Sequence, residues 1–133
     1  MNVKVVLDTN VLVSSLLSVY GTPAKIVEKV FDNDLILVCY FPILTEYYEV
    51  LHRDRFSFNA LKVKSILDFL EENAEMVNPL KCTIPMPDED DKIFLETAIY
   101  AKAILITGNK RHFPEADFIQ TPAEFIVEQG WNR

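Results

Sequence analysis

The fold is decided by the stretch Val3-Lys4-Val5-Val6-Leu7-Asp8-Thr9-Asn10 near the start of the chain. Its first five residues are mostly β-branched and apolar, which predicts a strand buried in a sheet. Asp8 follows directly, so a carboxylate is expected at the carboxyl end of that strand. Ligands of open α/β sheets bind beyond the carboxyl ends of the strands, and chemistry is therefore expected at Asp8. A helix follows without a turn, and the alternative role for Asp8 is to cap that helix.

Apolar runs alternate with helical patterns along the rest of the chain. Further strands are predicted at Leu35–Cys39, Glu75–Val77, Ala103–Thr107 and Phe118–Ile119. Helices are predicted over residues 11–17, from Thr22-Pro23 to Phe31, from Pro42 to His52, over Ala60–Asn73 with Ser57 or Asn59 as its cap, from the acidic run Asp88–Asp91 through Ala101, and after Thr121-Pro122. This alternation predicts right-handed βαβ units, and hence an α/β fold whose parallel sheet is covered by helices on both faces. No linker or repeat is visible, which predicts one domain over residues 1–133.

The composition fits a globular protein and limits the kinds of function. Half of the 133 residues are hydrophobic, and the formal net charge is −7 from 20 acidic and 13 basic residues. This excess argues against nucleic-acid binding through a broad basic surface, but it is compatible with carboxylates gathered around a metal ion. No apolar run of about 18 residues and no signal-peptide pattern occur, so we expect a soluble, cytoplasmic protein without membrane association. Cys39 and Cys82 are too few for a disulfide framework or a zinc site, and we expect both to be reduced.

Two acidic segments are candidates for the same site as Asp8. Glu46 lies on the edge of the apolar stripe of the predicted helix over 43–52, although a solvated surface position is the alternative. In the acidic run, Asp91 shares helical spacing with the inward apolar positions, and Asp90 is a second candidate. The run could also serve only the positive end of the helix dipole. Carboxylates from a strand end and two helices, without cysteine or histidine, form an oxygen-only set suited to Mg²⁺ or Mn²⁺.

The segment Thr107–Pro114 places polar groups at the edge of the sheet where Asp8 is expected. Gly108-Asn109 can be read simply as a turn. Lys110, Arg111 and His112 form the only dense basic patch of the chain. A lone histidine in such a patch is more often a surface residue than a catalytic one.

Four of these segments together resemble the PIN domain family, and within it the VapC-like toxin relatives. They are Val5–Leu12, Leu44–Leu51, Pro87–Ala98 and Ile106–Phe113. They occur in the order of the family's motifs and cover the chain nearly from end to end. The resemblance implies a three-layer α/β/α sandwich with a central parallel sheet and a metal-dependent ribonuclease site.

The resemblance also implies roles for particular residues. The metal ligands would be Asp8, Glu46 and Asp91, with Asp90 as the alternate. Asn109 would complete the catalytic set at a position where many members of the family carry aspartate. Asn10 and Thr107 would position Asp8 or a phosphate, and Lys110 and Arg111 would contact the RNA backbone.

The function that we expect is hydrolysis of RNA phosphodiester bonds with Mg²⁺ or Mn²⁺. The VapC likeness implies a small antitoxin protein that inserts a basic side chain into the acidic cleft, and the family implies a possible homodimer. One alternative is a catalytically silent PIN scaffold that binds RNA or a partner protein, which Asn109 favours. A haloacid-dehalogenase-type phosphatase is the other alternative, but it would require an aspartate where this chain has Asn10.

Overall fold

A computed structural model, which describes residues 2–132, contains one central sheet of five parallel strands. The strands are β1 (Val3–Leu7), β2 (Leu35–Cys39), β3 (Glu75–Met76), β4 (Ile104–Ile106) and β5 (Ile119–Gln120). Their order across the sheet is β3-β2-β1-β4-β5. In this register Val5 of the central strand pairs with Leu37 on one side and Ile104 on the other.

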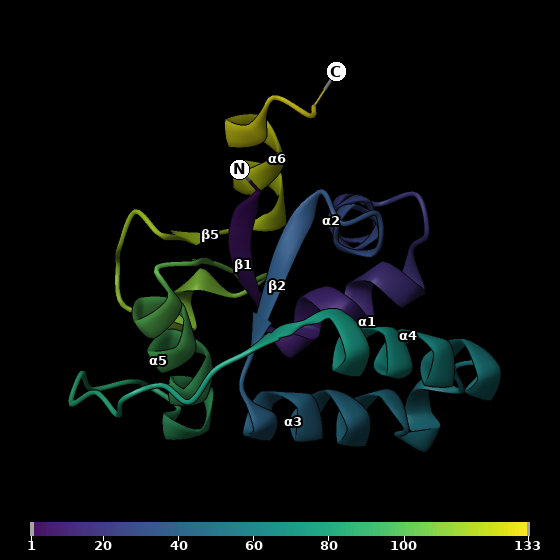
Figure 1. Ribbon diagram of the computed structural model, residues 1–133, viewed down its shortest axis with the longest axis horizontal. Coiled ribbons are helices and arrows are strands. Elements are labelled where there is room, and N and C mark those ends of the chain that lie inside the picture. The colour runs from purple at the N-terminus through teal and green to yellow at the C-terminus, as the bar shows by residue number, and fades with distance from the viewer. Residues whose placement is uncertain (1, 133) are drawn as a thin grey trace.

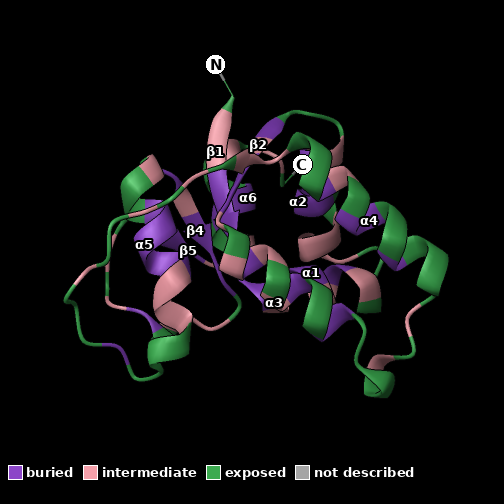
Figure 2. Ribbon diagram, turned by 60° about the horizontal axis from the view of Figure 1, so that its bottom comes forward, coloured by how far each residue is buried: buried purple, intermediate pink, exposed green. Residues whose placement is uncertain are grey.

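Helices cover both faces of this sheet. They are α1 (Thr9–Leu17), α2 (Thr22–Phe31), α3 (Phe41–Leu51), α4 (Ala60–Asn73), α5 (Lys92–Ala101) and α6 (Pro122–Gln129). Helix α5 contacts β1, β2 and β4 on one face, and α2 and α6 pack together on the other side of the strands (Figure 1). Helix α4 packs on α3, and its outer side is exposed (Figure 2). The predicted three-layer α/β/α sandwich is confirmed.

The core lies where the middle strands meet these helices. Residues Val5–Leu7 are buried on both faces of the sheet, which explains why the sequence of β1 is continuously apolar. The largest fully buried side chains are Tyr47, Phe94 and Phe125, from α3, α5 and α6. Burying a large apolar side chain contributes about 1.5–3 kcal/mol relative to exposure, so these contacts fix the helices against the sheet.

Several predicted element ends differ from the structure. Thr22 does not cap α2, because Gly21 takes the cap position and Thr22 is already helical. The acidic run does not start α5 directly: Glu89–Asp91 form a short 3₁₀ helix, which Asp88 caps by accepting from the backbone N–H of Asp90 at 2.9 Å. Strand β4 is one residue shorter at each end than predicted, and β5 is displaced by one residue.

Other ends agree with the sequence. Asn59, rather than Ser57, caps α4 by accepting from Lys62 N at 3.0 Å. Thr121 caps α6 and forms a reciprocal capping box with Glu124.

Strand order places a topological switch at the middle of the sheet. The chain passes from β1 outward through β2 to β3, and then crosses back to add β4 and β5 on the other side of β1. Open α/β sheets bind ligands in the crevice at such a reversal, beyond the carboxyl ends of the strands. That crevice lies between the ends of β1 and β4, where Asp8 and Thr107 stand.

Two further predictions concern the cysteines and the membrane. Cys39 and Cys82 are both free thiols. Within residues 2–132, no helix has the length and apolar character that crossing a bilayer requires. The assignment of one domain to residues 1–133 and the cytoplasmic location stay predictions.

Candidate active site

Asp8 occupies the crevice at the carboxyl end of β1. Its backbone N–H donates to Ile106 O at 2.9 Å, which extends the pairing of β1 with β4 by one residue. Asp8 stands at the N-cap position of α1, but its side chain makes no capping hydrogen bond. The carboxylate instead accepts from Thr107 Oγ1 at 2.7 Å and lies 3.4 Å from Asn10 Nδ2. The side chain is therefore held toward the β1–β4 crevice rather than toward the helix.

The environment of Asp8 disfavours its charged form. Only 8% of the residue is exposed, and burial raises the pKa of its carboxyl from 3.8 to about 6. The hydrogen bond from Thr107 lowers this pKa, whereas the charges of Asp91 and Glu46 raise it further. The three carboxylates consequently lie close enough to repel one another, although they belong to distant parts of the chain.

Glu46 is brought to this crevice by α3. Thr9 Oγ1, at the start of α1, donates a hydrogen bond to the Glu46 carboxylate. The neighbouring Tyr47 hydroxyl donates to Leu7 O at 2.5 Å, which fixes α3 against the end of β1. Partial burial raises the pKa of Glu46, the Thr9 hydrogen bond lowers it, and the charge of Asp91 raises it.

Asp91 approaches the crevice from the beginning of α5. It is half-buried, and its Oδ2 lies 3.5 Å from Nδ1 of His112. Burial raises the pKa of Asp91, as does the charge of Asp88, while His112 lowers it. Asp90 is exposed, whereas Asp91 is half-buried, and the backbone N–H of Asp90 donates to the Asp88 side chain.

A chain of polar contacts connects Asp8 with Asp91 along the segment that follows β4. Thr107 Oγ1, which donates to Asp8, accepts from the backbone N–H of Asn109 at 2.9 Å. The side-chain nitrogen of Asn109 lies 3.1 Å from Nε2 of His112, whose other ring nitrogen faces Asp91. Gly108 N also donates to Asn10 Oδ1 at 3.1 Å. The segment therefore positions the carboxylates from one side of the crevice.

The two predicted RNA contacts are placed differently from the carboxylates. Lys110 Nζ pairs with the Glu124 carboxylate at 3.1 and 3.3 Å, so its ammonium is directed toward α6. Arg111 is exposed. The structure thus brings Glu46, Asp91 and Asn109 into the surroundings of Asp8, whereas the ammonium of Lys110 is directed toward α6.

Sequence reasoning missed three residues of this site. From the sequence, no role in the site was assigned to Thr9, which donates to Glu46, or to Tyr47, whose hydroxyl donates to Leu7 O. His112 was interpreted as a surface residue, but it lies against both Asp91 and Asn109. The available signal for Thr9 was its position beside the strand-end aspartate, whereas the contact of His112 depends on the 3₁₀ helix Lys110–His112.

The donor set fits a hard divalent cation by its chemistry. Asp8, Glu46 and Asp91 offer only oxygen ligands, their pKa values are all raised by burial, and mutual repulsion favours a bound positive charge. No preassembled metal-binding group of three or more acidic, cysteine or histidine side chains is found within residues 2–132. The argument for a divalent cation therefore rests on the chemical type and the charge of these side chains, and not on a coordination geometry that is already formed. Fold and site together define a parallel α/β protein with an acidic, oxygen-only crevice at its switch point.

A family model confirms which group of such proteins this is. The model described as PIN domain matches residues 4–111, a span that runs from β1 to the 3₁₀ helix after β4. The chain belongs to the PIN domain family, whose members are in general nucleases. The matched span contains Asp8, Glu46, Asp91 and Asn109.

Two similar proteins extend this comparison. The uncharacterized protein MJ1680 of Methanocaldococcus jannaschii is 30% identical over an alignment with a length of 141 residues, which covers 95% of this chain and 91% of that protein. A chain in the crystal structure of VapBC2 from Rickettsia felis, bound to a DNA fragment from their promoter, matches with a TM-score of 0.57. That match is 19% identical and covers 89% of this chain and 96% of that chain, so it supports the fold.

Proposed function

We propose that this protein is an endoribonuclease that depends on Mg²⁺ or Mn²⁺, held by Asp8, Glu46 and Asp91. The observation that carries this proposal is the set of three mutually repelling carboxylates at the switch point of a PIN domain. Repulsion among these carboxylates is unfavourable, and a bound divalent cation would reduce it. When bound, the ion would lower the pKa of a bound water molecule and stabilise negative charge on the phosphate.

The residues around the carboxylates keep them in place for this chemistry. Thr107 and Asn10 orient Asp8, and Thr9 orients Glu46. Outer partners of this kind fix the orientation of ligand side chains and account for a large part of metal affinity. The backbone N–H of Asn109 donates to Thr107 Oγ1. The side chain of Asn109 carries no charge and lies against His112, which in turn lies against Asp91.

The decisive test compares RNA cleavage by two matched aspartate variants. Purified wild-type protein, Asp8→Asn and Asp32→Asn are incubated with total RNA and with DNA of mixed sequence, in Mn²⁺ or in EDTA. Asp32 is exposed at the end of α2, before β2, and so lies at the opposite edge of the sheet from Asp8. We expect cleavage of RNA only with metal, a loss of at least about 100-fold in Asp8→Asn, and an unchanged rate in Asp32→Asn. Equal cleavage by wild type and Asp8→Asn would refute the proposal.

A catalytically silent PIN scaffold is the second candidate, and Asn109 is the observation that favours it. Asn109 carries no charge and is engaged with Thr107 and His112. Calorimetric titration with Mn²⁺ separates the two functions, because a scaffold does not require the metal. Saturable binding that is lost in Glu46→Gln but kept in the exposed-site variant Glu71→Gln favours the nuclease.

The phosphatase alternative receives no support from the contacts of Asn10. Its amide bridges Asp8 Oδ2 and the backbone N–H of Gly108, which is a structural role without a transferable proton. A phosphatase of that type needs a second carboxyl group there. The phosphatase hypothesis would be supported only if the Asp91→Asn variant still hydrolysed a generic phosphomonoester.

We further propose that the chain is the toxin of a toxin–antitoxin pair. The crystal structure that shares its fold contains VapBC2 bound to promoter DNA, and the acidic crevice is suited to a basic side chain of a small partner protein. Co-expression with the product of the adjacent gene should yield a complex that suppresses RNA cleavage. An isolated chain that is cleavage-competent and harmless to growing cells would contradict this assignment, whereas homodimer formation stays a separate prediction.

A further inference from the structure

His112 lies beside the candidate active site, but the proposed chemistry gives it no role. It ends the 3₁₀ helix Lys110–His112, and its backbone N–H donates to Asn109 O at 3.0 Å, which fixes its place in the segment after β4. Its side-chain Nδ1 lies 3.5 Å from Oδ2 of Asp91, at the beginning of α5. An imidazole nitrogen is therefore adjacent to one of the three proposed metal ligands.

The distance between His112 Nδ1 and Asp91 Oδ2 is informative. It is long for a hydrogen bond, because the donor and acceptor atoms of N–H···O bonds are about 2.7–3.2 Å apart. It does suit two ligands of one metal ion. With metal bonds of about 2.1 Å, two donor atoms lie about 3.0 Å apart at a right angle and about 3.4 Å apart at a tetrahedral angle. The observed 3.5 Å therefore suits a shared cation better than a direct hydrogen bond.

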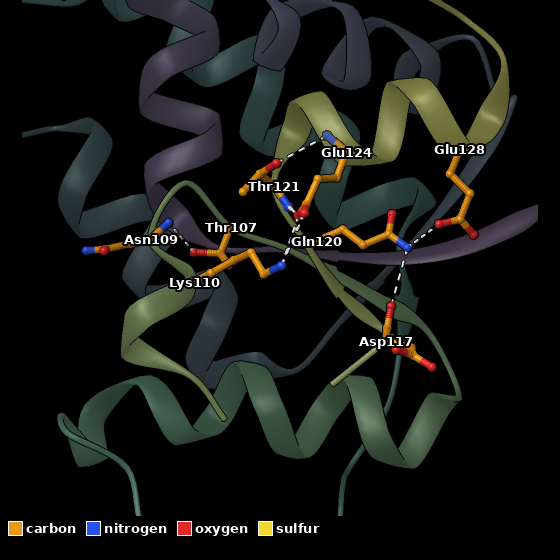
Figure 3. A network of polar contacts seen from close by, with 8 residues as sticks. All are labelled: Thr107, Asn109, Lys110, Asp117, Gln120, Thr121, Glu124 and Glu128. Carbon is orange, nitrogen blue, oxygen red and sulfur yellow. Dashed lines mark hydrogen bonds and ion pairs between the residues drawn. The ribbon is translucent and has the colours of Figure 1, made fainter. Parts of the chain in front are cut away.

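Asn109 holds the imidazole ring of His112 by one of its faces. Its Nδ2 lies 3.1 Å from Nε2 and 3.4 Å from Nδ1 of the ring. Nearly equal distances to both ring nitrogens place the amide over the ring, and not in line with the lone pair of one nitrogen. In Figure 3, the side chains of Asn109 and Lys110 point in opposite directions, with Lys110 directed toward α6. The amide thus restrains the plane of the ring and leaves Nδ1, at the ring edge, facing Asp91.

The same segment connects the ring with Asp8. Thr107 Oγ1 accepts from the backbone N–H of Asn109 at 2.9 Å and donates to Asp8 at 2.7 Å. The charge of Asp91 also acts on Asp8. An ion held at Asp91 would therefore lie near Asp8, and the ring of His112 is placed at that ion by the residues that orient Asp8.

We propose that His112 binds, through Nδ1, a divalent cation that Asp91 also binds, and that this contact makes the site select Mn²⁺ over Mg²⁺. The inference rests on the proposed function in that a metal ion binds at Asp91. Mg²⁺ prefers oxygen ligands, whereas imidazole nitrogen suits transition-metal ions. A neutral imidazole also adds a donor without adding negative charge to a crevice that already holds three carboxylates. The carboxylates alone accept either ion, so the selectivity depends on His112.

Electron paramagnetic resonance of bound Mn²⁺ tests the contact directly, in the intact protein without RNA. The sequence contains only two histidines, His52 and His112. Histidine is labelled with ¹⁵N, and electron spin echo modulation then detects coupling between Mn²⁺ and an imidazole nitrogen. We expect this coupling in wild type and in His52→Asn, and its loss in His112→Asn. His52 is the matched control because it is also exposed, and its Nδ1 lies 2.7 Å from Tyr48 O at the end of its own helix.

Competition titrations test the selectivity, because free and bound Mn²⁺ give different resonance signals and Mg²⁺ displaces Mn²⁺ in proportion to its own affinity. In His112→Asn we expect about tenfold weaker binding of Mn²⁺ and a change within about twofold for Mg²⁺. His52→Asn should leave both affinities within about twofold of wild type. His112 is exposed, so its substitution carries little risk to the fold, and thermal unfolding confirms that each variant is folded.

The inference is overturned if bound Mn²⁺ shows no histidine coupling, because His112 is then only an outer partner of Asp91. It is also overturned if the coupling persists in His112→Asn, or if that variant weakens Mn²⁺ and Mg²⁺ equally. These results differ from a failure of the proposed function. Mn²⁺ binding that is lost in Asp91→Asn but shows no nitrogen coupling contradicts only the role of His112, whereas the absence of any such binding contradicts both proposals.

Discussion

Replacing Asp8 with asparagine should stabilise the metal-free protein while it abolishes activity. The carboxyl of Asp8 has a pKa of about 6 in the folded protein and an ordinary value of 3.8 in an exposed chain. That difference corresponds to a penalty of up to about 3 kcal/mol for holding Asp8 charged in the fold. Asparagine keeps an oxygen that can accept from Thr107 but carries no charge, so most of this penalty should disappear.

The sign of the effect fixes its pH dependence. Below pH 3.8 the Asp8 carboxyl is protonated in both the folded and the unfolded chain, so its charge costs the fold nothing. As the pH rises through about 6, the folded protein must lose a proton that it holds more tightly than the unfolded chain does. The stabilisation by Asp8→Asn should therefore be small in acid, grow between these values and level off above them.

Urea unfolding in EDTA measures this effect, with Asp32→Asn as the control for a change of one exposed aspartate. Added Mn²⁺ should reduce the advantage of Asp8→Asn, because a cation that binds only the folded wild type stabilises it. The reasoning is refuted if Asp8→Asn is no more stable than wild type near neutral pH, or if its advantage is as large in acid.

Three further substitutions test individual contacts of the site and of the fold. Thr107→Val should raise the pKa of Asp8 above its wild-type value of about 6, because it removes the hydrogen bond that lowers this pKa, and NMR titration would detect the shift. Any metal-dependent cleavage should fall by about 10- to 100-fold in the same variant. Tyr47→Phe should lower the free energy of unfolding by about 1–3 kcal/mol, because Leu7 O loses its buried donor, as measured by urea unfolding. Thr121→Ala should cost about 1 kcal/mol through loss of the α6 capping box, as measured by thermal unfolding.

The Thr107 and Tyr47 variants each have a control elsewhere in the chain. Thr45→Val removes an exposed hydroxyl of α3 that bonds only within its own helix, so the pKa of Asp8 should not move. Tyr20→Phe removes a hydroxyl from a residue that is 99% exposed, and stability should be unchanged. If a variant and its control changed the pKa of Asp8 or the free energy of unfolding equally, the contact in question would contribute no measurable energy.

The strands and their parallel arrangement could be predicted from the sequence, because short patterns of residues indicate which segments are buried and in which direction they run. Continuous apolar runs such as Leu35–Cys39 predicted parallel strands, and parallel strands align their carboxyl ends. That rule alone predicted that Asp8 and Thr107 would share an edge, and a hydrogen bond joins them. The bounds of the short strands were less well predicted, because β5 pairs through only two residues, which single-residue preferences do not specify.

The missed contacts depend on turns rather than on periodic elements. His112 reaches Asp91 because residues 110–112 form a 3₁₀ helix after β4, and no pattern in the sequence fixes how that helix is rotated. Lys110 was expected to face RNA, but Glu124, which also completes the capping box of α6, attracts its ammonium. Such choices between nearby partners are decided by tertiary positions that the linear sequence does not display.

The energetic cost of Asp8 is itself an argument about function. The partners of Asp8, a threonine hydroxyl and an asparagine amide nitrogen, both donate, and an amide oxygen could accept from them without carrying charge into a buried crevice. A purely structural account therefore favours asparagine at this position. A carboxylate there, with Glu46 and Asp91 near enough to raise its pKa, costs stability, and the binding of a positive charge that we propose would offset that cost. The same logic explains why the stability gain of Asp8→Asn and its loss of cleavage should occur together, since both have their origin in one buried charge.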